Sequence, residues 1–495
     1  MSRITLLWFR RDLRLDDNPA LIHALTTGAP IVPVYIHAPD EEAPWTPGAA
    51  SRWWLHGSLL ALDASLQRFG SRLWIARGDS LTELRRIVAA TGATGVSWNR
   101  LYDPATRERD THIKQALRSD GLRCESHRST LLFEPWEIAS QTRSASKTGQ
   151  PYRVFSAFWR ACVRELSGIR PDPAPESLPA GFAPVDGLTV DDLGLLPTIP
   201  WDQGLRATWT PGESAALARA TAFLDARIGA YSVARDRPDA PGTSRLSPHL
   251  HFGEISPRRL LAMILDRFGD PAADPAESFV RELGWREFSY HLLYHFPRTP
   301  VEPLDPRFAD FPWRTEGVAE RLDAWQRGRT GIPLVDAGMR ELWHTGWMHN
   351  RVRMVAASLL TKNLRLPWQV GARWFWDTLV DADLASNTQG WQWTAGCGAD
   401  AAPYFRVFNP VRQGERFDPD GGYVRRWCPE LARLPNQYIH QPWTAPPPIL
   451  MAADIRLGCH YPLPIVDLAT SRQEALAAWG TIKGNRPNPP VTEFE

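Results

Sequence analysis

The segment Gly242-Thr243-Ser244-Arg245-Leu246-Ser247-Pro248 combines hydroxyl groups, a cation and the start of a predicted helix. Ser247 suits the N-cap position of that helix, and Pro248 suits its first turn. Hydroxyls and free backbone N–H groups at a helix N-terminus, with an arginine beside them, can bind a phosphate. Plain helix capping explains the same residues, and taken alone the segment favours capping.

A second segment places Glu282, Trp285, Arg286 and Phe288 on one predicted helix. These side chains do not form a single apolar stripe, so the helix has a mixed polar and aromatic face. On a solvated helix Glu282 and Arg286, four residues apart, would form an ordinary ion pair. In a pocket, Glu282 would instead accept hydrogen bonds beside a stacking indole. The residues alone favour the ion pair.

The segment from Thr345 to Met354 brings an amide, arginines, a thioether and an indole together at the start of a helix. Such a basic, aromatic-rich segment suits contact with a nucleotide or a nucleic acid. A polar helix cap with arginines in water is the alternative, and the residues leave it open.

Asp381 and Asp383 precede Trp391 and invite comparison with a metal site. However, no histidine or third carboxylate nearby completes a set of oxygen ligands, so the pattern predicts no metal. His291 and His295 lie four residues apart but lack the intervening glutamate of a zinc protease helix, and we interpret them as packing residues.

The elements that must position these groups fall into two classes. Up to residue 132, short apolar runs alternate with helix-length segments. Strands are expected at 4–9, 31–36, 73–76 and 95–98, and helices at 18–27, 51–69, 80–91 and 107–120. This alternation predicts an α/β domain with a parallel sheet covered on both faces.

Residues 133–212 read as a long interdomain linker, because eight prolines fall between 171 and 211 and few apolar positions are periodic. From 213 to 495 the helical period dominates, with helices expected at 215–228, 257–268, 276–296, 334–345 and 350–364. The predicted domains are therefore 1–132 (α/β), 133–212 (linker) and 213–495 (all-α).

Composition excludes several classes of protein. The chain has 495 residues, 43% of them hydrophobic, and 56 basic against 55 acidic residues, which is unlike a disordered chain, a collagen or a coiled coil. Five scattered cysteines give no disulfide framework. Neither a membrane-spanning apolar run nor a secretory signal is present in the sequence, and we expect a cytoplasmic protein.

Taken in order, the segments resemble the photolyase/cryptochrome flavoprotein family along the whole chain. The resemblance begins at Trp8-Phe9-Arg10-Arg11-Asp12-Leu13-Arg14-Leu15-Asp16-Asp17-Asn18 and continues through the segments above. It is strongest over 381–410, which includes Gly390-Trp391-Gln392-Trp393 and Ala401-Ala402-Pro403-Tyr404-Phe405. It implies a Rossmann-like N-terminal domain followed by a larger all-α FAD-binding domain.

The resemblance also implies a set of FAD-binding residues. The diphosphate and ribityl portion would contact Tyr231 and the residues Thr243, Ser244, Arg245, Leu246 and Ser247. The flavin and ribose side would be lined by Asp381, Ala382 and Asp383, with Arg353 against the isoalloxazine and Asn387 facing N5. Asparagine at this last position resembles photolyases, whereas plant cryptochromes typically carry aspartate.

The family's repair reaction transfers an electron from reduced, excited FAD to a pyrimidine dimer flipped out of DNA. By resemblance, Glu282 would accept hydrogen bonds from a thymine edge. The implied lesion and DNA contacts are Arg235, Trp285, Arg286, Asn350, Arg351, Met354, Trp393 and Gln413. Some of the 23 tryptophans would pass electrons, and Trp391, Trp368 and Trp313 match the family's relay from flavin to surface.

The resemblance does not identify the antenna chromophore. Leu101 and His251 stand where deazaflavin-binding members carry an acidic residue and a lysine, and Thr106 replaces a glutamate used by one folate-binding group. The segment Trp98 to Pro104 looks closer to a bacterial branch related to plant cryptochromes. We therefore hypothesise a methenyltetrahydrofolate antenna, with Trp53 and Trp54 as its walls.

Two functions remain at this point. The leading hypothesis is a monomeric, blue-light-driven deoxyribodipyrimidine photolyase that acts on UV-damaged DNA, and the alternative is a photosensory cryptochrome that uses the same flavin and relay without repair. His349-Asn350 stands where 6-4 photolyases carry paired histidines, which favours the cyclobutane dimer as substrate. The chain ends at Glu495 without the long polar tail of many signalling cryptochromes, and this too favours repair.

Overall fold

A computed structural model describes residues 4–138, 149–179, 187–270, 274–401 and 405–484. Of the sequence motifs, Ala402, Pro403 and Tyr404 lie outside the described residues. By their internal contacts the residues form two compact units. The first consists of 1–232, 243–297 and 376–385, and the second of 233–242, 298–375 and 386–495.

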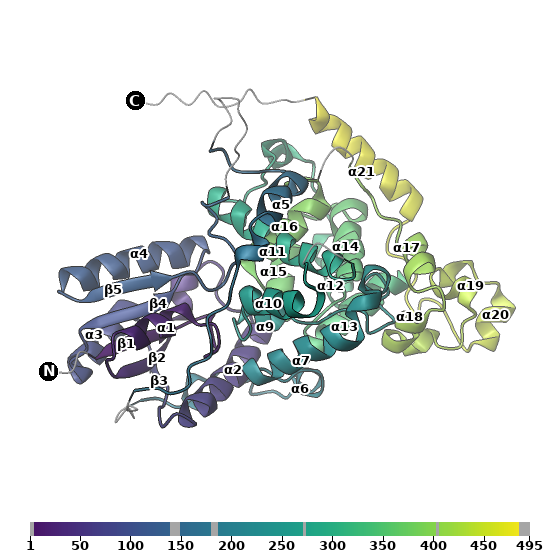
Figure 1. The fold of residues 1–495 in the computed structure, drawn as a ribbon. Helices are drawn as coiled ribbons and strands as arrows, with labels where there is room; N and C mark the ends of the chain where they lie inside the picture. Colours follow the sequence, from purple (N-terminus) through teal and green to yellow (C-terminus); the bar gives the residue numbers. More distant parts are fainter. Residues whose placement is uncertain (1–3, 139–148, 180–186, 271–273, 402–404, 485–495) are drawn as a thin grey trace. The chain divides into compact units, whose positions relative to one another are not determined.

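The first unit contains a five-stranded parallel sheet in the order β3-β2-β1-β4-β5 (Figure 1). The strands are β1 (Thr5–Phe9), β2 (Ile31–His37), β3 (Trp74–Arg77), β4 (Gly95–Asn99) and β5 (Arg123–His127). The first four strands were predicted with each end correct to within one residue. The fifth was missed because Arg-Cys-Glu-Ser-His forms a partly exposed edge strand without an apolar run.

The helices of this part are α1 (Pro19–Thr26), α2 (Ala49–Gln67), α3 (Ser80–Thr91) and α4 (Pro104–Ser119), with the 3₁₀ turn η1 (Pro39–Glu42). Helices α3 and α4 contact each other, while α1 packs on β1, β4 and β5. Right-handed crossovers place α1 and α2 on one face of the sheet and α3 and α4 on the other. The predicted parallel sheet with two covered faces is confirmed.

The core of the sheet explains some of the tryptophans. Trp8, Trp74 and Trp98 are buried with the apolar side chains of β1, β2 and β4, and the rings of Trp8 and Trp98 meet edge to face at 5.9 Å. These indoles fill the core of the sheet.

The segment that follows β1 is tied to a distant turn of the same unit. Leu13 N–H donates to Phe252 C=O at 3.1 Å, and the Arg14 guanidinium donates to Gly253 C=O at 2.8 Å. Gly253 has φ +66°, and a Cβ there would lie 2.3 Å from the Arg11 carbonyl oxygen. Only glycine allows the two backbones to approach this closely.

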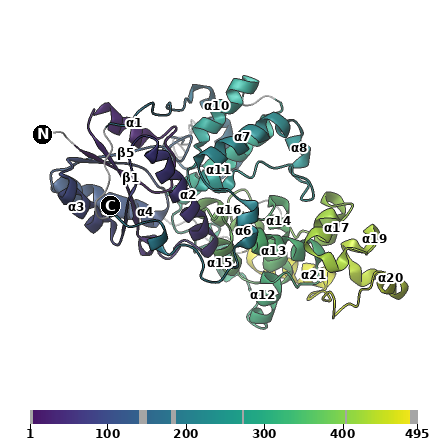
Figure 2. The ribbon, with the colours of Figure 1, turned by 90° about the horizontal axis from the view of Figure 1, so that it is seen from below.

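The stretch expected to be a linker contains the helices α5 (Phe155–Val163) and α6 (Gln203–Thr208) and the 3₁₀ turns η2 (Leu166–Gly168) and η3 (Asp191–Leu193). Further helices of the first unit are α7 (Glu213–Ala226), α9 (Ser247–His251), α10 (Pro257–Phe268) and α11 (Glu277–His295), with η4 (Ile228–Ala230) between α7 and α8 (Tyr231–Ala234). Figure 2 shows α7, α10 and α11 grouped together.

Among the described residues of the second unit the regular elements are helices, apart from an isolated bridge between Leu457 and Tyr461. Its elements are η5 (Pro306–Asp310), α12 (Val318–Gln326), α13 (Pro333–Thr345), α14 (Asn350–Ser358), η6 (Leu359–Asn363), α15 (Trp368–Thr378), α16 (Leu384–Ala395), α17 (Pro410–Phe417), α18 (Gly422–Trp427), η7 (Pro429–Leu431), α19 (Asn436–Ile439), η8 (Pro442–Thr444), α20 (Pro447–Ala452) and α21 (Leu468–Lys483). Helices α15 and α16 each include residues that belong to the first unit.

The helix predicted over 350–364 changes type along its length. It is α-helical to Ser358 and continues as the π-helix η6. Lys362 of η6 is buried, and its ammonium donates to Ala395 C=O at 2.6 Å and lies 3.1 Å from the centre of the Phe405 ring. Burial lowers the pKa of this lysine well below its ordinary value.

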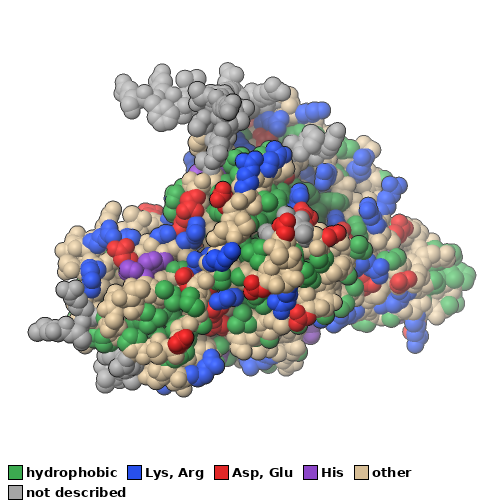
Figure 3. Space-filling view, viewed as in Figure 1, with side chains coloured by type: hydrophobic (Ala, Val, Ile, Leu, Met, Phe, Trp, Pro, Cys, Tyr) green, Lys and Arg blue, Asp and Glu red, His purple; other side chains and the backbone are tan. Residues whose placement is uncertain are grey.

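Charged side chains are mixed over the face seen in Figure 3, with arginines and acidic residues interspersed. Among the described residues none of the helices is long and apolar enough to cross a bilayer. The five cysteines form no disulfide, and four of them are buried.

Candidate active site

The predicted phosphate-binding segment lies in the first unit and contacts one of the predicted carboxylates. Ser247 Oγ donates to Asp381 Oδ2 at 2.6 Å across 134 positions of sequence. Ser247 is the first residue of α9, and the N-cap is Leu246, which makes no side-chain capping bond. The prediction that Ser247 caps the helix is therefore wrong, because its hydroxyl is bonded to a carboxylate instead.

Asp383 is buried in the same unit and is held by two side chains. The Tyr290 hydroxyl donates to Asp383 Oδ2, and His251 Nδ1 lies 3.5 Å from the same oxygen. Burial alone would raise the pKa of Asp383, but hydrogen bonding and the charge of His251 hold that pKa well below its usual range. Asp383 is thus a carboxylate that can accept further hydrogen bonds.

Tyr231 is buried beneath an aromatic cluster of the first unit. Its ring meets Phe223 of α7 at 5.5 Å and Phe279 of α11 at 5.4 Å, both edge to face. The packing fixes the ring, because both neighbours come from long helices of the same unit.

Helix α11 presents Glu282 and Trp285, both half-buried, on neighbouring turns. Trp285 stacks on Phe155 with ring centres 3.7 Å apart and planes within 9°. Arg286 donates to Thr130 C=O at 2.7 Å and approaches Glu287 at 3.6 Å. The described contacts of Arg286 are therefore with Thr130 and Glu287 rather than the ion pair with Glu282 that the sequence favours.

Glu287 is a buried carboxyl next to this face that the sequence analysis did not single out. Its Oε2 accepts from the backbone N–H groups of Leu132 and Phe133 at 3.0 and 3.2 Å. Burial raises the pKa of Glu287 from 4.5 to about 7. Nothing local in the sequence marks it, because its partners are more than 150 positions away.

We expect this glutamate to make stability depend on pH. Between pH 4.5 and about 7 the folded carboxyl keeps a proton that the unfolded chain has lost, so stability falls as pH rises through this window and then levels off. Glu287→Gln should reduce the loss of unfolding free energy between pH 5 and pH 8 by about 2 kcal/mol. Urea titrations of both proteins at the two pH values measure this difference. Glu277→Gln, a half-buried carboxylate in the first turn of the same helix, is the control and should leave the pH profile unchanged.

The second unit holds the predicted residues of α14. Asn350 is exposed, and Met354 is half-buried. The guanidinium of Arg351 donates to Asp236 at 2.6 Å and lies 4.4 Å from the centre of the Phe417 ring. Arg353 Nε donates to Met348 C=O at 2.8 Å, so both arginines are held in defined positions.

Trp391 is buried in the second unit against two other rings. It meets Phe375 at 5.0 Å and Trp325 at 6.0 Å, and a Cβ on Gly371 would lie 2.1 Å from its ring. Its Nε1 is buried without a hydrogen-bond partner among the described residues. On the same helix, Asn387 Nδ2 donates to Ala372 C=O at 3.0 Å, which fixes the orientation of the amide.

The other two tryptophans of the predicted relay also lie in the second unit. Trp368 is buried at the start of α15, and Trp313 is half-buried beside Phe311, with ring centres 4.5 Å apart. Arg314 N–H donates to Arg365 C=O at 2.8 Å, which joins the segment after Trp313 to the residues just before Trp368.

The remaining predicted contacts occupy the second unit as well. Trp393 is half-buried with Arg406 over its ring at 5.7 Å. Gln413 is half-buried on α17, and Arg235 lies in the segment 233–242.

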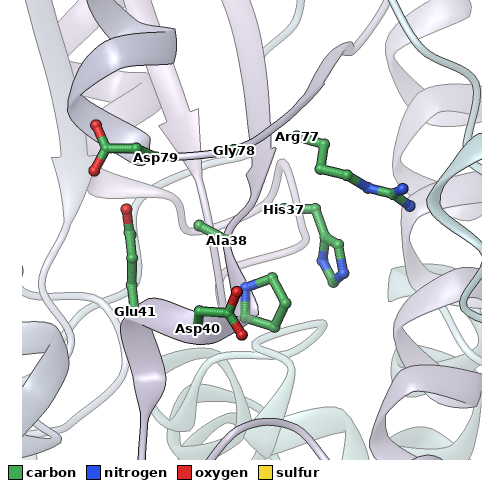
Figure 4. Close-up of a pocket in the computed structure, with 8 residues that line it drawn as sticks. His37, Ala38, Asp40, Glu41, Arg77, Gly78 and Asp79 are labelled. Carbon is green, nitrogen blue, oxygen red and sulfur yellow. The ribbon is translucent and has the colours of Figure 1, made fainter.

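A cavity of about 560 Å³ opens in the first unit at the carboxyl ends of β2 and β3 (Figure 4). It is lined by His37, Ala38, Pro39, Asp40, Glu41, Arg77, Gly78 and Asp79. Glu41 accepts from the N–H and hydroxyl of Ser80, both at 2.6 Å, so its carboxylate is held at the start of α3. Burial, followed by the charge of Arg77, lowers the pKa of His37 to about 4. Ligands of open parallel sheets bind at this edge, which is the signal that could have located the cavity.

The predicted walls of an antenna site do not line this cavity. Trp53 Nε1 donates to Asp202 at 3.0 Å and Trp54 Nε1 to Glu254 at 3.1 Å, and both indoles are buried. Both belong to α2, and Trp54 packs this helix against Trp209 and Phe252.

The predicted flavin residues of the first unit carry groups that a bound dinucleotide would use. Ser247 and Asp381 are paired as hydroxyl and carboxylate, and Asp383 is an anionic acceptor. Donors of this kind suit phosphate and acceptors of this kind suit ribose and flavin N–H groups.

Comparison with known families and proteins shows what the chain as a whole is similar to. Residues 5–179 match the DNA photolyase family model, and residues 279–481 match the model for the FAD binding domain of DNA photolyase. The chain is 47% identical to a deoxyribodipyrimidine photo-lyase of Agrobacterium fabrum, over 97% of this chain and 98% of that protein. It is 40% identical to cryptochrome-1 of Arabidopsis thaliana, over 94% of this chain and 68% of that protein.

Among solved structures, a bacterial class III photolyase from Agrobacterium tumefaciens superimposes with a TM-score of 0.90 at 46% identity, covering 98% of both chains. The two-part fold predicted from the sequence, an α/β domain and a helical FAD-binding domain, is confirmed by these matches.

Proposed function

The chain belongs to the photolyase/cryptochrome family, and on that premise we propose that it is a deoxyribodipyrimidine photo-lyase that repairs cyclobutane pyrimidine dimers under blue light. We propose further that it binds the dimer flipped out of the duplex, and that it acts as a monomer in the cytoplasm.

The observation that carries the proposal is the arrangement on α11. Trp285 is held by stacking on Phe155 and is half-buried, so part of its ring remains available to an apolar ligand. Glu282 lies one turn away on the same helix and is half-buried as well. An acceptor beside a fixed aromatic surface suits a thymine dimer, which presents N–H and carbonyl groups on one edge and apolar ring faces on the other.

The bound FAD supplies the light-excited electron in this chemistry. The chain's own residues hold and orient the reactants. Glu282 accepts hydrogen bonds from the lesion, Asn350 and Met354 contact it from α14, and Asn387 contributes its amide at the flavin. Trp391, Trp368 and Trp313 carry the oxidising equivalent towards the surface when the flavin is reduced by light.

Repair of a thymine-dimer oligonucleotide by reduced protein tests the proposal, with a dark sample as control. Light-dependent loss of dimers with turnover supports repair. Dimers that persist while the flavin is photoreduced normally would identify a photoreceptor instead. The alternative is a cryptochrome function, because the chain is 40% identical to a cryptochrome.

Glu282→Gln should lower the repair rate about tenfold, because a charge-assisted hydrogen bond to the lesion contributes roughly 1.5–3 kcal/mol. Glu277→Gln removes a half-buried carboxylate from the first turn of the same helix and should repair like wild type. Equal rates for the two variants would remove Glu282 from the lesion site.

We also propose that the cavity at β2 and β3 binds a methenyltetrahydrofolate antenna. A volume of about 560 Å³ accommodates a folate. The carboxylates of Asp40 and Asp79 can accept from the amino edge of a pterin. Reconstitution with the folate should add an absorption band beyond that of flavin, and Asp40→Asn with Asp79→Asn should reduce its binding. Absence of the band in reconstituted wild-type protein would refute the antenna.

A further inference from the structure

The N-terminus of α14 carries residues that the proposed function assigns to the lesion and the flavin. A buried, hydrogen-bonded pair of side chains contacts the residue just before this helix. Glu341 of α13 and Tyr423 of α18 are both buried, and the Tyr423 hydroxyl donates to Glu341 Oε2 at 2.6 Å. The same oxygen lies 3.4 Å from the backbone N–H of His349, the residue before α14. One carboxylate oxygen therefore joins three segments of the second unit.

The turn between α13 and α14 is fixed at several other points. Gly346 ends α13 with φ +68°, and Thr345 Oγ1 accepts from Trp347 N–H at 3.2 Å. His349 then caps α14, because its Nδ1 accepts from Arg351 N–H at 3.2 Å. Since His349 is bonded through its backbone to Glu341 and through its ring to Arg351, the position of the carboxylate sets where the helix begins.

The packing behind the turn leaves little room for adjustment. A Cβ on Gly338 of α13 would lie 2.3 Å from Val352 Cγ1, so α13 and α14 are in close contact. Burial, followed by the charge of Glu341, raises the pKa of Tyr423 well above its ordinary value. The phenol therefore remains a hydrogen-bond donor to Glu341 at every working pH.

We propose that Glu341 and Tyr423 are positioning residues for lesion recognition, acting through His349 on the N-terminus of α14. The identity of the ligand, DNA that contains a dimer, rests on the proposed repair function, whereas the contacts between Glu341, Tyr423 and His349 do not. Neither residue would touch DNA or flavin. Together they would fix the backbone from which Asn350, Arg351 and Met354 extend, so that these groups meet the dimer without first having to be ordered.

Two variants separate positioning from folding. Glu341→Met alone leaves the buried Tyr423 hydroxyl without its acceptor and should lower stability. The double variant Glu341→Met with Tyr423→Phe replaces both polar partners by apolar groups, which should recover the stability lost through the Tyr423 hydroxyl but not the bond to His349. Glu341→Gln keeps an oxygen that can accept both bonds and is the matched control.

The measurements use the FAD-loaded full chain. The double variant should retain its flavin and its photoreduction, should have a higher thermal midpoint than Glu341→Met, and should bind undamaged DNA as wild type does. Its affinity for dimer-containing DNA should fall about tenfold, with Glu341→Gln close to wild type. A double variant that discriminates dimers as well as wild type would overturn the proposal and leave the pair with a role in stability alone.

Hydrogen exchange tests the same geometry without DNA. The amides of residues 347–352 should exchange faster in the double variant than in wild type, while those of α18 should not change. Unchanged exchange at His349 would overturn the proposal. The wild-type protein tells the two failures apart. If the proposed function is wrong, wild type will bind dimer-containing DNA no better than undamaged DNA, while the difference in hydrogen exchange between wild type and the double variant will still be seen.

Discussion

Trp391→Phe is expected to remove most of the light-driven reduction of the bound flavin while leaving repair by chemically reduced protein largely intact. Indole is readily oxidised, whereas a phenyl ring is not, so the variant interrupts the relay at its buried end. Trp391 Nε1 meets no acceptor among the described residues, so none of them would take the proton of an oxidised Trp391. In the proposed relay the oxidising equivalent would then pass to the next indole.

The measurement is the rate at which the flavin absorption band bleaches under blue light with an external reductant. Trp325→Phe is the matched control, because Trp325 is equally buried, packs edge to face against Trp391 at 6.0 Å and lies outside the predicted relay. It should photoreduce at close to the wild-type rate. Normal bleaching in Trp391→Phe would exclude this residue from the relay, and loss of repair by the chemically reduced variant would give it a role in the lesion site.

Asp336→Ala is expected to be among the most destabilising single substitutions in the second unit. The buried carboxylate accepts from Thr330 N–H at 2.7 Å, Thr330 Oγ1 at 2.6 Å, Gly331 N–H at 3.0 Å and the Tyr461 hydroxyl at 2.7 Å. Each buried donor left without an acceptor costs roughly 1–3 kcal/mol. We expect a loss of at least about 4 kcal/mol and a thermal midpoint lower by roughly 10 °C.

Tyr461→Phe provides the comparison, because it removes one of the four donors and leaves the carboxylate bonded to the loop. It should cost about 1 kcal/mol. Thermal unfolding followed by circular dichroism, with flavin release recorded in parallel, measures both variants. Similar midpoints for Asp336→Ala and Tyr461→Phe would mean that the loop hydrogen bonds are replaced by water and contribute little.

Local sequence patterns were sufficient for the elements that bury an apolar face. The ends of strands β1 to β4 and of helices such as α3 and α10 were predicted to within a residue or two. Apolar periodicity and helix caps depend only on neighbouring residues, so they can be recognised from the sequence. The edge strand β5 was missed because its partly exposed residues carry no apolar run. Helix α6 was missed because it lies within the proline-rich stretch 171–211, and α5, which precedes that stretch, was missed because it was assigned to the same linker.

The sequence by itself determined the family, the α/β and helical classes, and the residue types available for flavin and lesion, since these depend on motifs that can be recognised along the chain. Only the tertiary structure decided which partner each polar group takes. Ser247 was expected to cap a helix and instead bonds Asp381, and Arg286 was expected to pair with Glu282 and instead bonds Thr130 C=O. The physical reason is that a buried donor or acceptor must be satisfied by whatever the fold brings within about 3 Å, and that group is often more than a hundred residues away.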